Sequence, residues 1–526
     1  MAKNKEKFSP RWGVIILPVL VFGAVLIMGF INSELLESTL YGYFEWFMVN
    51  FGWFVDIAAL GFVLFCLGMI VHPIGNLKFG GEDAEPEFSF WHWFAMSLCA
   101  GIAIGIVMWP PEVLMHTLEP AKGMGLEPKS PEAMLWAMKK TFLHWTLTPY
   151  AIYVVCGTII GYVHYNLQKK FAASSALYPL LGDKAFGKVA TVVDSITLFA
   201  ICGGVAGSLG YGILQLGSAL EFSFGIQPGP VVWGAIATVI IASYTTSSIT
   251  GLDKGIQWLS DKNTWLFIGL LFFVLFAGPT AFSLNLTTQA AGDFINNFIQ
   301  TSTFTSPFQL SGDMWPQWWD MYWFTDWLSF APIVGLFLAR LCYGRTIRQF
   351  VIVNLLLPAG FGMLWFGVFG SFLLHLEFFQ GAEIAAVMDA KGMEILMLKM
   401  FDFLPLSNII RPVMILTILI SFITLADSMT STTSMVSTTG FEKYTTEEPP
   451  VKMKVFWGLL MGGVAVVSLM IGGIDGVKVI KTMAGIPILF FEVLMIIGFV
   501  RHRMHMGSDD NMNLESESQE STTVDQ

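Results

Sequence analysis

The chain has 526 residues, of which 54% are hydrophobic and only 13% charged, and its mean hydropathy is +0.64. Soluble domains carry roughly 25% charged residues, so this composition predicts a protein that folds in the lipid bilayer. The formal net charge of −11, with no basic cluster in the sequence, argues against a nucleic-acid partner.

Apolar segments long enough to cross a bilayer recur along the whole chain. The first follows a basic N-terminus. It is too long for the core of a signal peptide and no small-residue cleavage site follows it, so we expect it to be retained. We therefore predict an all-α integral membrane protein with twelve transmembrane helices. The expected spans are 12–32, 52–72, 90–110, 142–166, 191–220, 230–250, 264–284, 317–340, 350–375, 409–432, 455–473 and 480–500.

Lysines and arginines indicate which loops face the cytoplasm. They follow the fourth, sixth, eighth, tenth and twelfth spans, whereas the alternate loops carry fewer basic residues and several acids. The positive-inside rule then places both termini in the cytoplasm, because an even number of spans returns the chain to the side where it started. We expect a multi-pass protein of the cell inner (plasma) membrane.

Two tails and two external segments lie outside the predicted spans. Residues 1–11 form a short cytoplasmic tail and the helical domain covers 12–503. The acidic tail 504–526 lacks aromatic residues and is expected to be disordered. The external stretches 285–316 and 377–408 contain periodic apolar positions, which predict helices lying on the membrane surface or packed over the bundle.

The third span contains small residues at Gly101, Ala103 and Gly105 and then two consecutive prolines, while the eighth carries Pro332. Broken helices at corresponding places in two halves of a chain are typical of inverted-repeat transporters with a binding site near the midplane. Small residues also simply allow helices to approach closely in membranes. The residues alone leave both interpretations open.

The fourth span begins FLHWTLTPYAIY, in which Trp145, Tyr150 and Tyr153 surround Pro149. Tryptophan and tyrosine gather at membrane interfaces, so this stretch alone fits an interfacial belt, core packing or a box that holds a ligand. His144 beside it is expected to pack or to form hydrogen bonds rather than to bind a metal, because no second ligand has suitable spacing. Glu112 is expected at the external mouth.

The eighth span carries a carboxylate among aromatic rings. At 100° per residue, Trp323, Asp326, Trp327 and Phe330 fall within an arc of about 100° on one helix face. A carboxylate inside a bilayer costs roughly 2.5–3.5 kcal/mol, so it normally faces a cavity or a partner. Asp326 therefore either pairs with a Lys, Arg or hydroxyl group, lies in water, or helps to bind a cation. Aromatic faces attract quaternary ammonium groups, which have no N–H to donate.

No nucleotide-binding loop or hydrolase elbow occurs in a convincing context, so neither an enzyme nor an ATP-driven pump is expected, and no cofactor or metal is predicted.

Several motifs resemble, in the same order, those of the betaine/choline/carnitine transporter family. DWLSFAPIVGLFLARLCYGRTIRQF resembles the family signature at the eighth span, with ARLCYGRTIRQ matching the pattern ARxxxGRTxRE. Further resemblances along nearly the whole chain are AGIAIG in the third span, FLHWTLTPYAIY in the fourth, GLDKGIQWLSD after the sixth, TLADSMTSTTSM in the tenth and EEPP after it.

The resemblance implies a LeuT-type 5+5 inverted repeat, formed by spans three to seven and eight to twelve after two extra peripheral helices, and often a homotrimer. It implies a secondary transporter that moves small quaternary ammonium compounds, such as choline, glycine betaine or carnitine, by alternating access. Its substrate box would use Trp145, Tyr150 and Tyr153 with Trp327 and Phe330. A sulfonium or tertiary methylamine analogue such as dimethylsulfoniopropionate is the nearest alternative substrate.

The sequence also departs from the family pattern. Asp326 stands where members typically have tryptophan, and an unpaired negative charge there would favour a net cation such as choline. Sodium-coupled relatives have Thr-Ser where this chain has Thr424 and Leu425, and sodium-independent exchangers have arginine where it has Gln257. The coupling ion, Na⁺ or H⁺, or exchange without sodium, therefore stays open. The acidic tail favours nutrient uptake or exchange over osmotic sensing.

Overall fold

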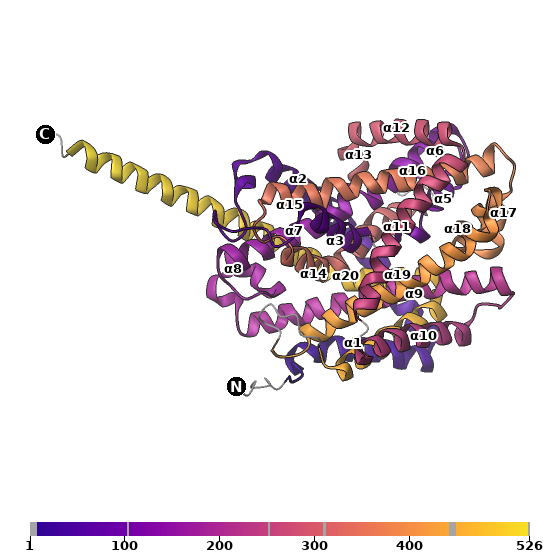
Figure 1. The fold of residues 1–526 in the computed structure, drawn as a ribbon, viewed down its shortest axis with the longest axis horizontal. Coiled ribbons are helices and arrows are strands. Elements are labelled where there is room, and N and C mark those ends of the chain that lie inside the picture. Colours follow the sequence, from indigo (N-terminus) through magenta and orange to yellow (C-terminus); the bar gives the residue numbers. More distant parts are fainter. Residues whose placement is uncertain (1–7, 103–104, 251–252, 309–311, 441–448, 524–526) are drawn as a thin grey trace.

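The computed structural model describes residues 8–102, 105–250, 253–308, 312–440 and 449–523, and within them every named element is a helix (Figure 1). Each predicted span overlaps at least one of these helices. The long ones are α1 (Trp12–Ile31), α2 (Ser33–Val71), α9 (Lys188–Phe224), α10 (Pro230–Thr250), α11 (Asp253–Ala277), α14 (Tyr322–Arg340), α16 (Leu357–Phe378), α19 (Ser407–Val436) and α20 (Val451–Thr523).

By length and hydropathy, eight helical segments in the described part of the chain are suited to cross a membrane. A ninth arises if α11 and α12 (Thr280–Asn296), which are bent by 111° with respect to each other, count as one broken span. The protein is therefore an all-helical, multi-span membrane protein, while the count of twelve spans stays a prediction.

The third predicted span covers α3 (Phe90–Ile102) and α4 (Gly105–Met108). It ends where the chain turns at Pro110 and Pro111, before α5 (Glu112–Leu118) begins. Proline has no N–H to donate, so a helix starts readily just after it. The eighth span differs from expectation, because Pro332 lies inside the continuous helix α14 and does not break it.

The fourth predicted span consists of two helices, α6 (Pro131–Trp145) and α7 (Leu147–Gly161), separated at Thr146 (φ −126°, ψ −106°). Pro149 lies in the first turn of α7, where the missing N–H has no intrahelical partner to lose. The break therefore leaves Trp145 at the end of one helix and Tyr150 and Tyr153 in the next.

The last two predicted spans both lie within α20, which is divided by non-helical backbone at Gly472 and Gly473. Gly473 has φ +56° with ψ −126°, a conformation open to glycine and strained for other residues. At Gly472 a Cβ would lie 2.2 Å from the Tyr41 hydroxyl oxygen. The break thus needs two glycines, and it directs the second half of α20 through the bundle.

The two stretches predicted to lie outside the membrane contain helices in their described residues, as expected. Residues 285–316 include most of α12 and then α13 (Phe298–Ser302), and residues 377–408 include α17 (Ile384–Lys391) and α18 (Leu396–Lys399). In the acidic tail, for which the sequence predicts disorder, α20 continues in helical form to Thr523 and projects away from the bundle (Figure 1). That stretch holds Met, Leu, Glu and Gln without proline, so nothing local forces the helix to end.

Close packing of α7 against α14 gives a test of the fold. A Cβ at Gly335 would lie 2.7 Å from Cys156 Cβ, so we expect Gly335→Ala to destabilise the protein by about 1–3 kcal/mol through overpacking. Thermal denaturation in detergent would measure the effect. Gly23→Ala is the matched control, because nothing lies within 4 Å of its added Cβ, and it should leave the midpoint unchanged or raise it.

Candidate functional site

One pocket lies inside the bundle between α4, α6, α7, α9, α14, α19 and α20. Seven aromatic rings, one carboxylate and one ammonium group face it. Its lining residues are Gly105, Trp109, Trp145, Tyr153, Ser208, Tyr211, Trp323, Asp326, Trp327, Phe330, Val334, Leu425, Met429 and Lys481.

The structure brings together most of the residues predicted from the two aromatic segments. Trp145 lies against Trp323 and Trp327, with ring centroids 4.5 and 5.3 Å apart, and Tyr153 lies 5.6 Å from Trp327. Tyr150 does not line the pocket, although its ring centroid is 6.5 Å from that of Trp327. The rings meet edge-on or tilted, which leaves aromatic faces available as the walls of the pocket.

Trp145 is fixed by its neighbours on both sides. Its ring packs on the backbone of Gly105, where a Cβ would lie 2.5 Å from the indole. Its Nε1 donates a hydrogen bond of 2.8 Å to Glu112 Oε2, and Trp327 Nε1 donates one of 3.0 Å to the backbone oxygen of His144. Two walls of the pocket are thus attached to polar groups behind them.

Asp326 forms a buried ion pair with Lys481. Lys481 Nζ is 2.5 Å from Asp326 Oδ1, and the two side chains are only 4% and 6% exposed. The Lys481 Nζ also lies 4.8 Å from the ring centroid of Tyr211. Of the alternatives given for Asp326, pairing with a basic residue matches this geometry. Because Lys481 balances the charge of Asp326, the carboxylate no longer gives a reason to expect a substrate with a net positive charge.

Lys481 and its neighbour Lys478 were missed by the sequence reasoning, which treated 480–500 as an apolar span. Lys478 Nζ lies 3.9 Å from the ring centroid of Trp319 and 5.2 Å from that of Tyr322. Ionisable residues inside a predicted span are functional candidates by default, so this signal was present in the sequence for Lys481, whereas Lys478 lies between two predicted spans. Trp109 and Tyr211, which also line the pocket, had no such signal.

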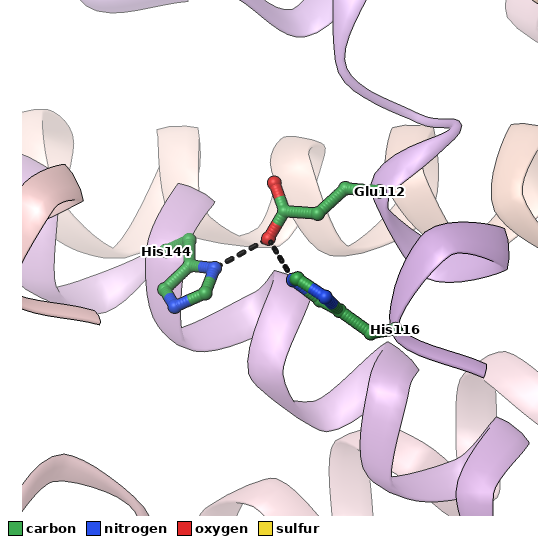
Figure 2. Close-up of side chains that lie close together, drawn as sticks. All are labelled: Glu112, His116 and His144. Carbon is green, nitrogen blue, oxygen red and sulfur yellow. Dashed lines mark hydrogen bonds and ion pairs between the residues drawn. The ribbon is translucent and has the colours of Figure 1, made fainter. Parts of the chain in front are cut away.

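Behind Trp145 lies a cluster of Glu112, His116 and His144 (Figure 2). His116 Nε2 is 3.2 Å from Glu112 Oε1, and His144 Nδ1 makes a direct hydrogen bond to the same oxygen. The other nitrogen of His144 lies 2.6 Å from Asp320 Oδ1. His144 is therefore a hydrogen-bonding histidine, as predicted. The position predicted for Glu112 at the external mouth is wrong, because its side chain is fully buried.

The donor atoms of this cluster lie within 4.8 Å of one another. A zinc ion needs about 2.0–2.2 Å to each nitrogen or oxygen, and the direct His144–Glu112 hydrogen bond leaves no such space between those two atoms. The arrangement is that of a hydrogen-bonded network and not of a metal centre.

Six residues are the candidates for ion coupling or for gating, namely the small residues of the third span with Gln257, Thr424 and Leu425, and the structure describes only part of this set. Gly105 and Leu425 line the pocket. Gly101 lies in α3, Gln257 in α11 and Thr424 in α19, but the surroundings of these three are not described. Ala103 lies outside the described residues. The choice of coupling ion therefore receives no support from these positions.

Comparison with known proteins is consistent with a multi-span membrane transporter. A family model described as "BCCT, betaine/carnitine/choline family transporter" matches residues 13–507, so the chain belongs to this family and is a transporter, not an enzyme. It is 31% identical to a probable glycine betaine transporter of Desulfitobacterium hafniense over 85% of this chain and 88% of that protein.

Two further relatives cover similar shares of the sequence. The ectoine/hydroxyectoine transporter of Virgibacillus pantothenticus is 31% identical over 87% of this chain and 89% of its own length. The glycine betaine transporter OpuD of Bacillus subtilis is 32% identical over 91% of both chains.

The buried ion pair in the pocket makes a prediction about stability. Lys481→Met leaves Asp326 unpaired in an apolar interior, and we expect a loss of about 3–5 kcal/mol. The double variant Lys481→Met/Asp326→Asn should recover most of that loss, because no buried charge is left. Thermal denaturation in detergent would measure both.

The matched control is Lys399→Met, which removes a partly exposed pair with Asp402 and should change stability by about 1 kcal/mol or less. Equal destabilisation by the single and the double variant at the buried pair would contradict the expected coupling.

Proposed function

We propose that the protein is a secondary active transporter of small quaternary ammonium compounds and that it prefers zwitterions of the betaine type. The observation that carries this proposal is the pocket itself, in which aromatic rings and the Lys481–Asp326 pair border the same space. The comparisons support the transporter class, and the choice of substrate rests on the chemistry of the pocket.

The aromatic walls suit the head group of such a substrate. A trimethylammonium group has no N–H, so it gains little from hydrogen-bond acceptors but is attracted to aromatic faces by about 0.5–2 kcal/mol each. Trp145, Trp323, Trp327 and Phe330 supply these faces, and Tyr153 adds a further ring. Burial of the pocket strengthens the attraction, because water is excluded.

The ion pair suits the other end of a zwitterion. Lys481 and Asp326 together carry no net charge, so the pocket as a whole does not require a net cation. A substrate carboxylate can approach Lys481 while its onium head lies near the rings and Asp326, so that each charge has a partner. Choline carries no carboxylate to place beside Lys481. Glycine betaine and carnitine therefore fit better than choline, which revises the preference drawn from Asp326 alone.

The names of the relatives agree with this preference. Two are glycine betaine transporters, one of them named as probable, and one is an ectoine/hydroxyectoine transporter. A sulfonium zwitterion such as dimethylsulfoniopropionate is the second candidate, because its head group also lacks an N–H and is attracted by the same aromatic faces. A tertiary methylamine analogue belongs to the same group of alternatives.

The transport cycle that we propose is alternating access within twelve spans. Spans three to seven and eight to twelve would form the inverted repeat, with both termini in the cytoplasm of a plasma-membrane protein. The third span, in contact with Trp145 at Gly105, is the element proposed to move against the pocket. A homotrimer is proposed from the family resemblance. Symport, antiport and substrate:product exchange all stay open at this level.

Uptake into proteoliposomes tests the proposed function. We expect saturable uptake of labelled glycine betaine or carnitine, with choline competing at least about tenfold more weakly, a difference of about 1.4 kcal/mol in binding. Dimethylsulfoniopropionate is included as a competitor to separate the second candidate from the first. Absence of saturable uptake for every methylated onium compound would contradict the proposal.

A substitution in the box tests where the head group lies. Trp327→Leu removes one aromatic face, and we expect substrate affinity to fall by about five- to thirtyfold, since one cation–π contact contributes roughly 1–2 kcal/mol in a dry site. Binding measured by scintillation proximity in detergent would show the change. Trp265→Leu is the control, because that tryptophan is 60% exposed and does not line the pocket. Unchanged affinity in Trp327→Leu would mean that the cage is elsewhere.

A further inference from the structure

A chain of buried ionisable side chains begins at the pocket wall and leads away from it. Trp145 Nε1 donates a hydrogen bond to Glu112 Oε2, and the other oxygen of Glu112 is hydrogen-bonded to His144 Nδ1. His144 Nε2 lies 2.6 Å from Asp320 Oδ1, and Asp320 Oδ2 lies 2.5 Å from Lys140 Nζ. These four ionisable side chains are at most 2% exposed. None of them lines the pocket, so substrate binding does not account for them.

Hydrogen-bond geometry sets the number of protons in this chain. Both ring nitrogens of His144 face carboxylate oxygens, and an imidazole ring donates at both nitrogens only when it is the imidazolium cation. The negative charges of Glu112 and Asp320 are then balanced by the positive charges of His144 and Lys140, so these four side chains together have no net charge. If His144 lost one proton, one of its ring nitrogens would carry no hydrogen. The carboxylate oxygen that faces this nitrogen would then lose its hydrogen bond.

The hydrogen-bonded series of side chains ends at Lys140, which lies toward the protein surface. Lys140 Nζ donates to the backbone oxygen of Thr301 at the end of α13, in the predicted external region. The neighbouring Lys139 pairs at 2.7 Å with Asp293, and both of those side chains are partly exposed. The cluster therefore connects the edge of the external helices with the wall of the pocket.

We propose that Glu112, His144 and Asp320 form a binding site for one proton, whose movement is coupled to transport. The inference rests on the proposed transport function and identifies the coupling ion. The hydrogen bond that Trp145 Nε1 donates to Glu112 Oε2 is the connection to the pocket, because Glu112 accepts from that indole with one carboxylate oxygen and from His144 with the other. Any change in the proton on the cluster changes the strength of the bond that fixes the pocket wall.

Proton release takes one acid–base step followed by a transfer to water. The Nδ1–H bond of His144 breaks and an O–H bond forms at Glu112 Oε1, which leaves a neutral imidazole and a neutral carboxylic acid. The acid then gives its proton to a water molecule admitted when the pocket opens, and the cluster keeps one additional negative charge. A proton that later returns from water to Glu112 Oε1 passes back to Nδ1 and restores the imidazolium ion, while the Nε2–H group stays hydrogen-bonded to Asp320 throughout.

Four other ionisable groups interact with these residues from the surrounding helices, and the first of them is the phenol of Tyr211 on α9, which lies in the field of Glu112. His116 on α5 lies 3.2 Å from Glu112 Oε1. Lys478 on α20 lies close enough to interact electrostatically with Glu112. Asp56 on α2 lies in the field of Asp320 and Lys140, and its buried carboxyl group has no hydrogen-bond partner among the described residues. Asp56 is therefore the competing position for the proton, and the test includes it.

The experiment first counts protons on the unmodified protein. Substrate is added to purified transporter in weakly buffered detergent solution containing a pH-sensitive dye, over a series of starting pH values. We expect about one proton taken up or released per transporter on substrate binding in part of this range. Binding with no proton exchange at any pH would overturn the proposal while leaving the proposed transport function intact; absence of binding would contradict both.

The second measurement uses a proton gradient. With the membrane potential clamped at zero and sodium absent, a gradient of one pH unit should drive up to about tenfold accumulation of a zwitterion, the limit for one proton per substrate. Asp320→Asn and His144→Gln should lose this accumulation and the proton count. They should still exchange labelled for unlabelled substrate across the membrane, which needs no net proton movement and also shows that the variants are folded.

Matched variants decide where the proton is held. Lys139→Gln, next to Lys140 but in the surface pair with Asp293, should keep both the accumulation and the proton count. Asp56→Asn should keep them too, and loss of the proton count in that variant alone would overturn the assignment. Co-purification of one equivalent of zinc, with substrate binding lost on chelation, would overturn it as well, because the cluster would then hold a metal ion.

Discussion

The pairing of buried charges is the constraint on which the rest of this structure depends. A charged side chain within a bilayer-spanning bundle has no lipid partner and little water, and leaving it unpaired is strongly destabilising. Here Lys481 meets Asp326 and Lys140 meets Asp320, each at 2.5 Å. Each pair joins α14, or the π-helical segment Gln317–Met321 just before it, to another helix. The position of α14, which carries much of the aromatic wall, is thus fixed by electrostatics as well as by packing.

Breaks in the helices make these pairings geometrically accessible. The interruption at Gly472 and Gly473 directs the second half of α20 so that Lys481 reaches Asp326, and the interruption at Thr146 separates Trp145 from the helix that carries Tyr153. A straight helix would present these side chains at intervals fixed by 100° per residue. Broken ones allow side chains from several directions to surround one small space, which is common for binding sites in transporters.

Local patterns in the sequence were sufficient to predict an all-helical, multi-span membrane protein and most of the aromatic wall of the pocket. Helix periodicity placed Trp323, Asp326, Trp327 and Phe330 on one face, and all four line the pocket. Tyr150 was selected with Trp145 and Tyr153 from the motif around Pro149 and from the family resemblance, not from helix geometry, and it does not line the pocket.

Contacts between distant segments were beyond what local patterns can predict. Lys481 is 155 positions from Asp326, and Glu112 is 32 positions from His144, so no periodicity relates the members of either pair. The apolar character of the last predicted span, 480–500, also concealed its single lysine, Lys481. A search for opposite charges inside predicted spans would have suggested Lys481 as a partner for Asp326. No comparable signal existed for the burial of Glu112, because a carboxylate after two prolines also fits an exposed loop.

The Lys481–Asp326 pair also restricts how such a pocket can change during evolution. Loss of either residue alone leaves a buried charge, so intermediates with one substitution carry a stability penalty that a new substrate preference must outweigh. Single substitutions at Lys481 or Asp326 are therefore not neutral, whereas the aromatic residues around the pair can be replaced one at a time. The charge character of the substrate is therefore expected to change rarely and by paired substitution, while the size of its head group is free to vary gradually.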